Sequence, residues 1–261
     1  MTKRILITGS TDGIGRLTAQ KLAAAGHHVL IHGRSQTKLS AVAAEIGAAE
    51  TYLADFSRLG EVAGMAKTIL GKHDRLDVLI NNAGILKTGD PLTESGRDIR
   101  FEVNTLAPFL LTRSLLPIIP PEGRIVNLSS AAQTRVDIAS MTRHRPMDDM
   151  EAYAQSKLAL TIWSAEMAKE RPGGPVVVAV NPGSLLASKM VREGFGIGGN
   201  DLNVGADILV RAAVSDEFEK ASGRYFDNDK GTFAAPHAAA LDAAHSADVM
   251  EAILSVLDTA N

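Results

Sequence analysis

Short runs of β-branched and aliphatic residues alternate with longer segments rich in Ala and Leu along most of the chain. Strands that alternate with helical segments are typical of βαβ units and a parallel sheet. The pattern predicts an α/β fold: a doubly wound parallel sheet of about seven strands with helices on both faces. We expect strands at residues 4–8, 28–32, 51–54, 76–80, 124–128, 176–180 and, with a weaker pattern, 224–226.

Helical segments are expected at 14–25, 98–116 and 151–170. No repeat, low-complexity tract or Pro-, Ser- and Gly-rich linker divides the chain, so we predict one domain over residues 1–261. The stretches 131–149 and 183–200 are predicted to be long loops that cover a site, because each follows the end of a strand, where ligands bind in such folds.

Composition excludes several classes of function. A net charge of −3 offers no electrostatic footprint for nucleic acid, and no apolar run approaches the roughly 20 residues of a membrane span. The absence of cysteine excludes disulfides and thiol catalysis, and no histidine spacing suggests a metal site. Because no targeting signal is recognised, a cytoplasmic location is favoured.

A glycine-rich turn directly follows the first expected strand and opens the first helix. Glycines permit a tight turn and the close approach of a pyrophosphate, which backbone N–H groups and the helix dipole stabilise. A ligand-free loop is the alternative, but the placement between strand and helix favours a dinucleotide-binding, Rossmann-like domain. The turn reads Thr8-Gly9-Ser10-Thr11-Asp12-Gly13-Ile14-Gly15.

Further motifs follow in order after the later strands, and together they resemble those of the short-chain dehydrogenases/reductases. The interval from Ser130 to Tyr153 is 23 positions, longer than in the commonest members, so the layout is closest to the retinol dehydrogenase and protochlorophyllide reductase branch. The additional residues are expected to form part of the substrate rim or to alter an oligomer interface. The motifs are Asp55, Asn81-Asn82-Ala83-Gly84, Asn104, Ser129-Ser130, Tyr153-x-x-x-Lys157 and Asn181-Pro182-Gly183.

This resemblance implies a nicotinamide cofactor. Asp55 would cap the adenine, although it could simply begin the next helix, and Asn82-Ala83-Gly84 would lie along the cofactor, although it could be an ordinary turn. Ser188 stands one position later than the family's threonine. The implied cofactor-binding residues are Gly9, Ser10, Thr11, Asp12, Gly13, Ile14, Gly15, Arg34, Ser35, Asp55, Phe56, Asn82, Ala83, Gly84, Tyr153, Lys157, Pro182, Gly183 and Ser188.

The end of the second strand bears on the choice between NADP and NAD. No carboxylate stands there to bind the adenosine ribose, and Arg34 supplies a cationic fork suited to a 2′-phosphate. NADP is therefore favoured, with NAD as the alternative. Asp12 counts against NADP, and Arg16 either compensates for it or serves as a surface residue of the first helix.

Tyr153 and Lys157 are four apart and so share one face of a helix. A carbonyl that accepts hydride needs a proton donor at its oxygen, and Tyr153 can supply it. Lys157 and the bound nicotinamide are expected to lower the phenol pKa. By resemblance, Lys157 also binds the nicotinamide ribose, and Asn104 anchors a proton-relay water. Ser130, the second serine of its pair, would polarise the substrate carbonyl.

The sequence thus predicts an oxidoreductase that transfers hydride between NADPH and a carbonyl or alcohol substrate, without a metal. The alternatives are an NAD-dependent alcohol dehydrogenase and, from another class, a non-catalytic NADP-binding sensor. A homodimer or homotetramer is implied only by the resemblance. Apolar residues in the two loops, such as Met141 and Phe195, suggest a partly apolar substrate or else lid packing.

Overall fold

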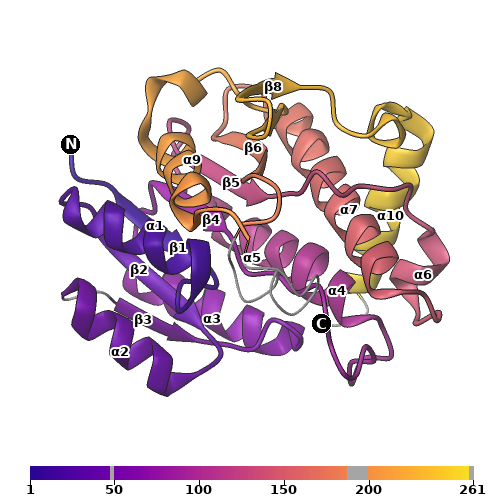
Figure 1. Cartoon of the computed structure of the whole chain (residues 1–261), viewed down its shortest axis with the longest axis horizontal. Coiled ribbons are helices and arrows are strands. Elements are labelled where there is room, and N and C mark those ends of the chain that lie inside the picture. Colours follow the sequence, from indigo (N-terminus) through magenta and orange to yellow (C-terminus); the bar gives the residue numbers. More distant parts are fainter. Residues whose placement is uncertain (48–49, 187–198, 259–261) are drawn as a thin grey trace.

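The computed structural model describes residues 1–47, 50–186 and 199–258. Eight strands form one sheet in the order β3-β2-β1-β4-β5-β6-β7-β8 (Figure 1). The strands are β1 (Arg4–Ile7), β2 (His28–Gly33), β3 (Glu50–Leu53), β4 (Val78–Asn81), β5 (Arg124–Leu128), β6 (Val176–Asn181), β7 (Tyr225–Asp227) and β8 (Thr232–Ala234). The α-helices are α1 (Gly13–Ala24), α2 (Gln36–Ile46), α3 (Leu59–Lys72), α4 (Ile99–Phe101), α5 (Ala107–Leu115), α6 (Ile138–Thr142), α7 (Asp149–Glu170), α9 (Leu202–Val214) and α10 (Ala243–Asp258).

Strands β1 to β7 pair in parallel, and β8 pairs antiparallel with β7. The predicted doubly wound α/β fold is therefore confirmed, but the sheet has eight strands rather than about seven. The strand order reverses between β1 and β4. In open α/β sheets, ligands bind in the crevice at the carboxyl ends of the strands beside such a reversal.

Alternate residues of the central strands enter two separate cores. Leu6 and Leu30 face the cluster formed with α3, α5, α7 and α10, whereas Ile5 and Ile7 face the cluster formed with α1, α2 and α9. Figure 1 shows α1 and α9 side by side over the sheet. Because both faces are covered, each central strand is apolar on both sides and reads as a continuous aliphatic run.

The helix predicted over 98–116 is interrupted. A π turn over Glu102–Leu106 separates α4 from α5, and the N–H of Ala107 bonds to the carbonyl of Glu102, five residues back. Pro108 explains the interruption, because a proline has no N–H to donate to residue 104 and its ring would clash with that carbonyl. The other two predicted helices, 14–25 and 151–170, correspond to α1 and α7.

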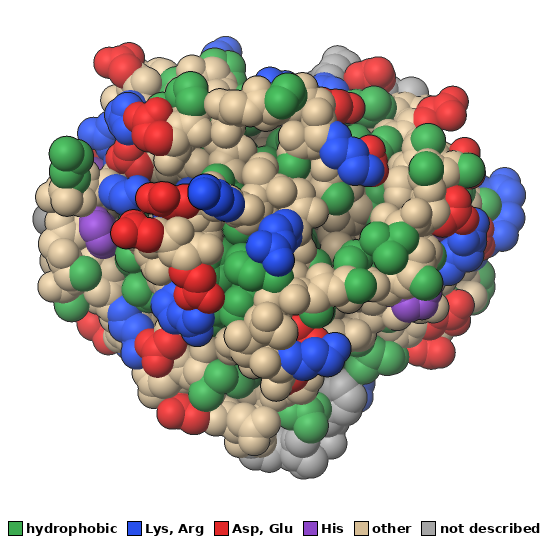
Figure 2. Space-filling view, turned by 90° about the horizontal axis from the view of Figure 1, so that it is seen from above, with side chains coloured by type: hydrophobic (Ala, Val, Ile, Leu, Met, Phe, Trp, Pro, Cys, Tyr) green, Lys and Arg blue, Asp and Glu red, His purple; other side chains and the backbone are tan. Residues whose placement is uncertain are grey.

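The stretch 131–149, predicted to be a loop, contains the short helix α6, which packs against α10. Only the two ends of the other predicted loop, 183–200, fall within the described residues. Over the described ranges, no helix is both long and apolar enough to cross a bilayer. Acidic and basic side chains are interspersed on the face shown in Figure 2, and neither sign dominates it.

Candidate active site

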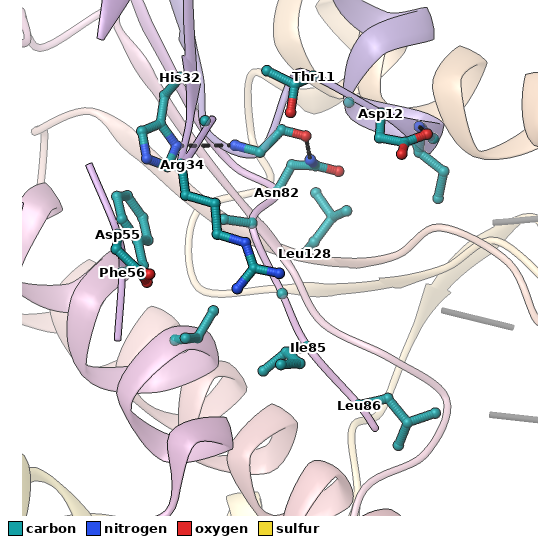
Figure 3. A pocket seen from close by; sticks show the side chains of 18 of the residues that line it. Thr11, Asp12, His32, Arg34, Asp55, Phe56, Asn82, Ile85, Leu86 and Leu128 are labelled. Atoms are coloured by element: carbon teal, nitrogen blue, oxygen red, sulfur yellow. Dashed lines mark hydrogen bonds between the residues drawn. The ribbon is translucent and has the colours of Figure 1, made fainter. Parts of the chain in front are cut away.

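A cavity of about 590 Å³ opens at the carboxyl ends of the central strands, beside the reversal of strand order (Figure 3). Ser10 does not line this cavity, and its buried hydroxyl donates to the carbonyl of Ile7. Ser188 falls outside the described residues. Most of the predicted cofactor residues line the cavity: Gly9, Thr11, Asp12, Gly13, Ile14, Gly15, Arg34, Ser35, Asp55, Phe56, Asn82, Ala83, Gly84, Tyr153, Lys157 and Pro182.

The glycine turn is packed tightly against the segment after β4. Asn82 donates from its side chain to the carbonyls of Thr8 and Gly9, at 2.8 and 3.0 Å. Gly9 has a φ of +64°, and a Cβ at that position would lie 2.8 Å from the Cα of Ala83. A Cβ on Gly15 would overlap the Asn82 amide. The turn thus needs glycine both for its conformation and for this close approach.

Asp12 caps α1, accepting from the N–H of Gly13 at 2.8 Å. Its carboxylate also pairs with Lys38 of α2 at 3.2 Å, and Lys38 lines the same cavity. Asp12, which counted against NADP in the sequence, is therefore paired with a cation, Lys38, that the sequence analysis did not identify. Arg16 pairs with Glu45 at 2.5 Å, which favours the surface interpretation of that arginine.

Arg34 reaches over the cavity from the turn after β2, and Figure 3 shows its guanidinium in the open space between Asp55 and Ile85. Its side chain is exposed, and among the described residues it forms no ion pair. A planar cationic fork that forms no ion pair within the described part of the chain is suited to bind a phosphate.

His32, which the sequence analysis missed, lies near the end of β2 and joins the turns after β1 and β3. Its Nδ1 accepts from the N–H of Gly9 at 3.1 Å, and its Nε2 donates to the carbonyl of Ala54 at 3.1 Å. The ring stacks on Phe56, with 4.2 Å between centroids. Burial lowers the pKa of His32 to about 4, so the imidazole is neutral at physiological pH. The one sequence feature that marks His32 is its position at the end of an aliphatic run.

Both interpretations of Asp55 fit the structure. Its Oδ1 accepts from the N–H and the hydroxyl of Ser57, at 2.9 and 2.8 Å, which forms the turn that leads into α3. The same residue lines the cavity. Phe56 also lines the cavity, although its ring is mostly buried against His32.

Tyr153 and Lys157 lie together on α7, with 5.7 Å between the lysine Nζ and the phenol ring centroid. Lys157 donates to the carbonyl of Leu128 at 2.7 Å, and burial lowers its pKa to about 7. Burial raises the pKa of Tyr153, and a hydrogen bond with Ser130 offsets this in part. Desolvation disfavours the charged form of both side chains, and the expectation that Lys157 together with a bound nicotinamide lowers the phenol pKa stays a prediction.

The two serines after β5 face different partners. Ser129 contributes to the cavity wall, but its hydroxyl lies 2.6 Å from that of Thr161. The hydroxyl of Ser130 faces the Tyr153 phenol instead. Ser129 lines the cavity and Ser130 does not, so the choice of Ser130 as the serine that polarises the substrate carbonyl stays a prediction.

Asn104 lies behind the cavity on the π turn. Its side chain accepts from the N–H of Ile85 at 2.8 Å and donates to the carbonyl of the same residue at 2.9 Å. A third bond runs to the hydroxyl of Ser156, also at 2.9 Å. This geometry makes Asn104 a clamp on the segment after Gly84, while its role as a water anchor stays a prediction.

The turn after β6 is held by Asp229, which was not predicted. Its carboxylate accepts from the N–H and the hydroxyl of Ser184, at 2.8 and 2.6 Å. Gly183 has a φ of +117° and donates to the side chain of Asn181 at 3.2 Å. The turn brings Pro182 to the wall of the cavity that Lys157 and Tyr153 also line.

The cavity suits a nicotinamide dinucleotide along its length. Backbone N–H groups and the positive end of α1 can hold a pyrophosphate, Arg34 and Lys38 supply cations at one end, and the half-buried Tyr153 and the buried Lys157 lie at the other. The described ranges contain no cluster of three or more metal-ligating side chains. Fold and site together define a nicotinamide-dependent oxidoreductase of the Rossmann-like class.

Comparison with known proteins gives the family. The family described as short chain dehydrogenase matches residues 3–195, and the chain belongs to that family. Retinol dehydrogenase 13 of Homo sapiens is 31% identical, over 90% of this chain and 79% of that protein. Retinol dehydrogenase 12 of Bos taurus is 32% identical, over 90% and 81%. The predicted resemblance to the retinol dehydrogenase branch is therefore confirmed, and the protein is an NAD(P)-dependent oxidoreductase.

Solved structures of similar fold agree with this family assignment. An uncharacterised protein from Mycobacterium paratuberculosis has a TM-score of 0.81 at 27% identity, covering 97% of this chain and 92% of that one. A short chain dehydrogenase from Shigella flexneri complexed with NADP has a TM-score of 0.68 at 28% identity, over 87% and 96%. A 3-ketoacyl-(acyl-carrier-protein) reductase from Brucella melitensis complexed with NADH has 0.68 at 25%, over 88% and 97%. Similar structures thus bind either nicotinamide cofactor.

Proposed function

We propose that the protein reduces a carbonyl substrate with NADPH, and that Tyr153 donates the proton. The observation that carries the proposal is the half-buried Tyr153 phenol, which faces Ser130 on one side and has Lys157 one helical turn away. NADPH supplies the hydride when bound, and the residues of the chain bind it, orient the carbonyl and move the proton.

Each of the three side chains has a distinct role in this proposal. The raised pKa keeps the Tyr153 phenol protonated at neutral pH, which suits proton donation to the oxygen that becomes an alkoxide. Ser130 donates a hydrogen bond to that oxygen. Lys157 holds the nicotinamide ribose and, when protonated, stabilises the phenolate that is left after the transfer.

Preference for NADPH rests on Arg34 and Lys38, two cations at the rim of the cavity where the adenosine ribose would lie. The Lys38 contact also reduces the repulsion that Asp12 would exert on a 2′-phosphate. Losing one charge-assisted contact costs about 1.5–3 kcal/mol, which corresponds to a roughly 10- to 100-fold loss of affinity.

Binding titrations followed by nicotinamide fluorescence test this preference. Arg34→Ala should weaken NADPH by that factor and leave NADH nearly unchanged, whereas Arg171→Ala, at an exposed arginine distant from the cavity, should change neither. NADH binding as tight as NADPH binding in the wild type would instead support the NAD-dependent alcohol dehydrogenase.

Tyr153→Phe tests the catalytic assignment. We expect the reductase rate to fall by about 10²–10⁴-fold with NADPH affinity retained, because general acid catalysis contributes that much. Tyr52→Phe is a matched control, because Tyr52 is a buried tyrosine with a bonded hydroxyl outside the cavity. Equal turnover by Tyr153→Phe and wild type would contradict the assignment. An absence of turnover in both, with NADPH bound, would support the sensor alternative.

For the substrate, we propose an apolar aldehyde or ketone. Ile85, Leu86 and Val103 give the cavity apolar wall, and the curated relatives are named for retinol. Retinal is therefore the first probe for turnover, with a small polar ketone for comparison. A cytoplasmic location and a homodimeric or homotetrameric state stay predictions.

A further inference from the structure

Two side chains from outside the cavity converge on the backbone of Ser130. The hydroxyl of Tyr225 on β7 donates to the Ser130 carbonyl at 3.1 Å, and the Nε2 of Gln133 donates to the same oxygen at 2.8 Å. Tyr225 is only 6% exposed and lies 95 positions away in sequence. A carbonyl oxygen has two lone pairs, and both are used here by protein donors.

Gln133 extends this arrangement in two directions. Its Oε1 accepts from the N–H of His237 at 3.0 Å, and its Nε2 also reaches the hydroxyl of Ser129 at 3.3 Å. Ser129 in turn contacts Thr161, whose hydroxyl donates to the carbonyl of Lys157 at 2.8 Å. The segment after β5 is thus tied at once to the C-terminal part of the chain and to the helix that bears the catalytic pair.

The direction of these bonds favours one orientation of the Ser130 hydroxyl. Its Oγ accepts from the N–H of Ala132 at 3.1 Å, which leaves its single proton available to donate, to the Tyr153 phenol in this structure and to the substrate oxygen in the proposed reaction. Burial and the carboxylates of Asp227 and Asp229 raise the pKa of Tyr225. Tyr225 therefore remains a neutral donor at any pH at which the protein would be assayed.

We propose that Tyr225 and Gln133 are positioning residues, which hold the Ser130 hydroxyl against the Tyr153 phenol by fixing the Ser130 carbonyl. This inference rests on the proposed role of Ser130. Neither residue lines the cavity, and the hydrogen bonds of both run to the Ser130 carbonyl rather than to Tyr153 or Lys157. Their removal should lower kcat and leave NADPH affinity unchanged, because a misplaced catalytic group costs rate rather than cofactor binding.

A double-mutant cycle tests the inference. It uses Tyr225→Phe, Ser130→Ala and the double variant, with retinal, or the carbonyl compound that the wild type reduces fastest, as the probe. Tyr225→Phe should lower kcat on the order of tenfold. In the Ser130→Ala background the same change should have almost no effect, because the group that it positions is gone. Gln133→Met should behave like Tyr225→Phe, and thermal unfolding checks that each variant folds.

A spectroscopic signature separates positioning from a general loss of structure. The chain has three tyrosines, so ¹³Cζ-tyrosine labelling gives three assignable NMR signals. At pH 7, Tyr225→Phe should move the Tyr153 signal in the same direction as Ser130→Ala does, since the first weakens and the second removes the hydrogen bond between Ser130 and Tyr153. Tyr52→Phe, the matched control, should leave the Tyr153 signal and kcat at their wild-type values.

Three outcomes would overturn the inference. The first is a Tyr225→Phe variant with wild-type kcat and an unmoved Tyr153 signal, while Ser130→Ala is slow. The second is an effect of Tyr225→Phe that persists undiminished in the Ser130→Ala background. The third is a Ser130→Ala variant as active as wild type, and this last result would also show that the proposed role of Ser130 itself is wrong.

Discussion

Lys157 is expected to destabilise the fold that contains it. The side chain is only 3% exposed, and desolvation lowers its pKa from 10.5 to about 7. The unfolded chain binds a proton at this lysine more tightly than the folded protein does. Replacing it by Met, which is of similar length and uncharged, should therefore raise stability while abolishing the proposed catalysis. Such trade-offs between stability and function are common at active sites.

The size and the pH dependence of the effect follow from the two pKa values. A change from 10.5 to about 7 corresponds to about 5 kcal/mol at 1.36 kcal/mol for each pH unit. Met also leaves the Leu128 carbonyl without its donor, which costs about 1–3 kcal/mol. The net gain for Lys157→Met is about 2–4 kcal/mol below pH 7. It should shrink as pH rises from 7 toward 10.5, because the folded wild type then no longer bears the cost of the charge.

Urea unfolding of the protein at pH 6, 8 and 10 measures this difference. At pH 6, Lys157→Met should unfold at higher urea, and its melting temperature should be roughly 4–16 °C higher, at 2–4 °C for each kcal/mol. Lys67→Met, at an exposed lysine on α3, is the control and should change stability little at any of these pH values. A Lys157→Met variant less stable than wild type at pH 6, or an advantage independent of pH, would refute the reasoning.

Three further predictions concern the framework of the site. The pKa of His32 is lowered from 6.5 to about 4, so wild-type stability should fall by up to about 3 kcal/mol as pH drops through that interval, whereas His32→Gln should show a flatter urea-unfolding profile. Gly9→Ala should destabilise the protein by about 1–3 kcal/mol and weaken NADPH binding in the fluorescence titration. The control Gly64→Ala, at a position on α3 that faces open space, should stabilise it by about 0.5–1 kcal/mol. Equal effects of the two substitutions on stability would contradict the steric argument. Arg100→Met leaves the buried Asp98 carboxylate without its ion-pair partner and should lower the free energy of unfolding by about 3–5 kcal/mol in chemical unfolding. A loss below about 1 kcal/mol would contradict this.

Where the sequence predicted the fold well, burial on both faces was the reason. The central strands β1, β2, β5 and β6 lie between two helical layers, and their continuous aliphatic runs locate them to within a residue or two. β8 is different, because its three residues are partly exposed and pair with one neighbour only. A segment so short shows no period, and its pairing with β7 depends on the turn between them rather than on its own composition.

Within the site, the residues that could be predicted from the sequence are those that belong to a recognised motif. Tyr153, Lys157 and the glycine turn are recognised from spacing along one segment, so the sequence located them. His32, Lys38 and Tyr225 are ordinary residues in ordinary patterns. Their importance lies in contacts with residues 22 to 95 positions away, which only the folded chain brings together.

The π turn that carries Asn104 shows how the effect of one proline on helix hydrogen bonding shapes the site. Pro108 prevents a regular helix from continuing through this position, so the backbone bonds five residues back and the turn widens. Asn104 lies within that turn and clamps Ile85 in both directions. The clamp holds Gly84 so close that a Cβ there would lie 3.3 Å from the Asn104 amide oxygen and 3.4 Å from the Lys157 Nζ. The irregular turn therefore sets the space beside the catalytic lysine, and a proline four residues after the asparagine is the sequence signal of it.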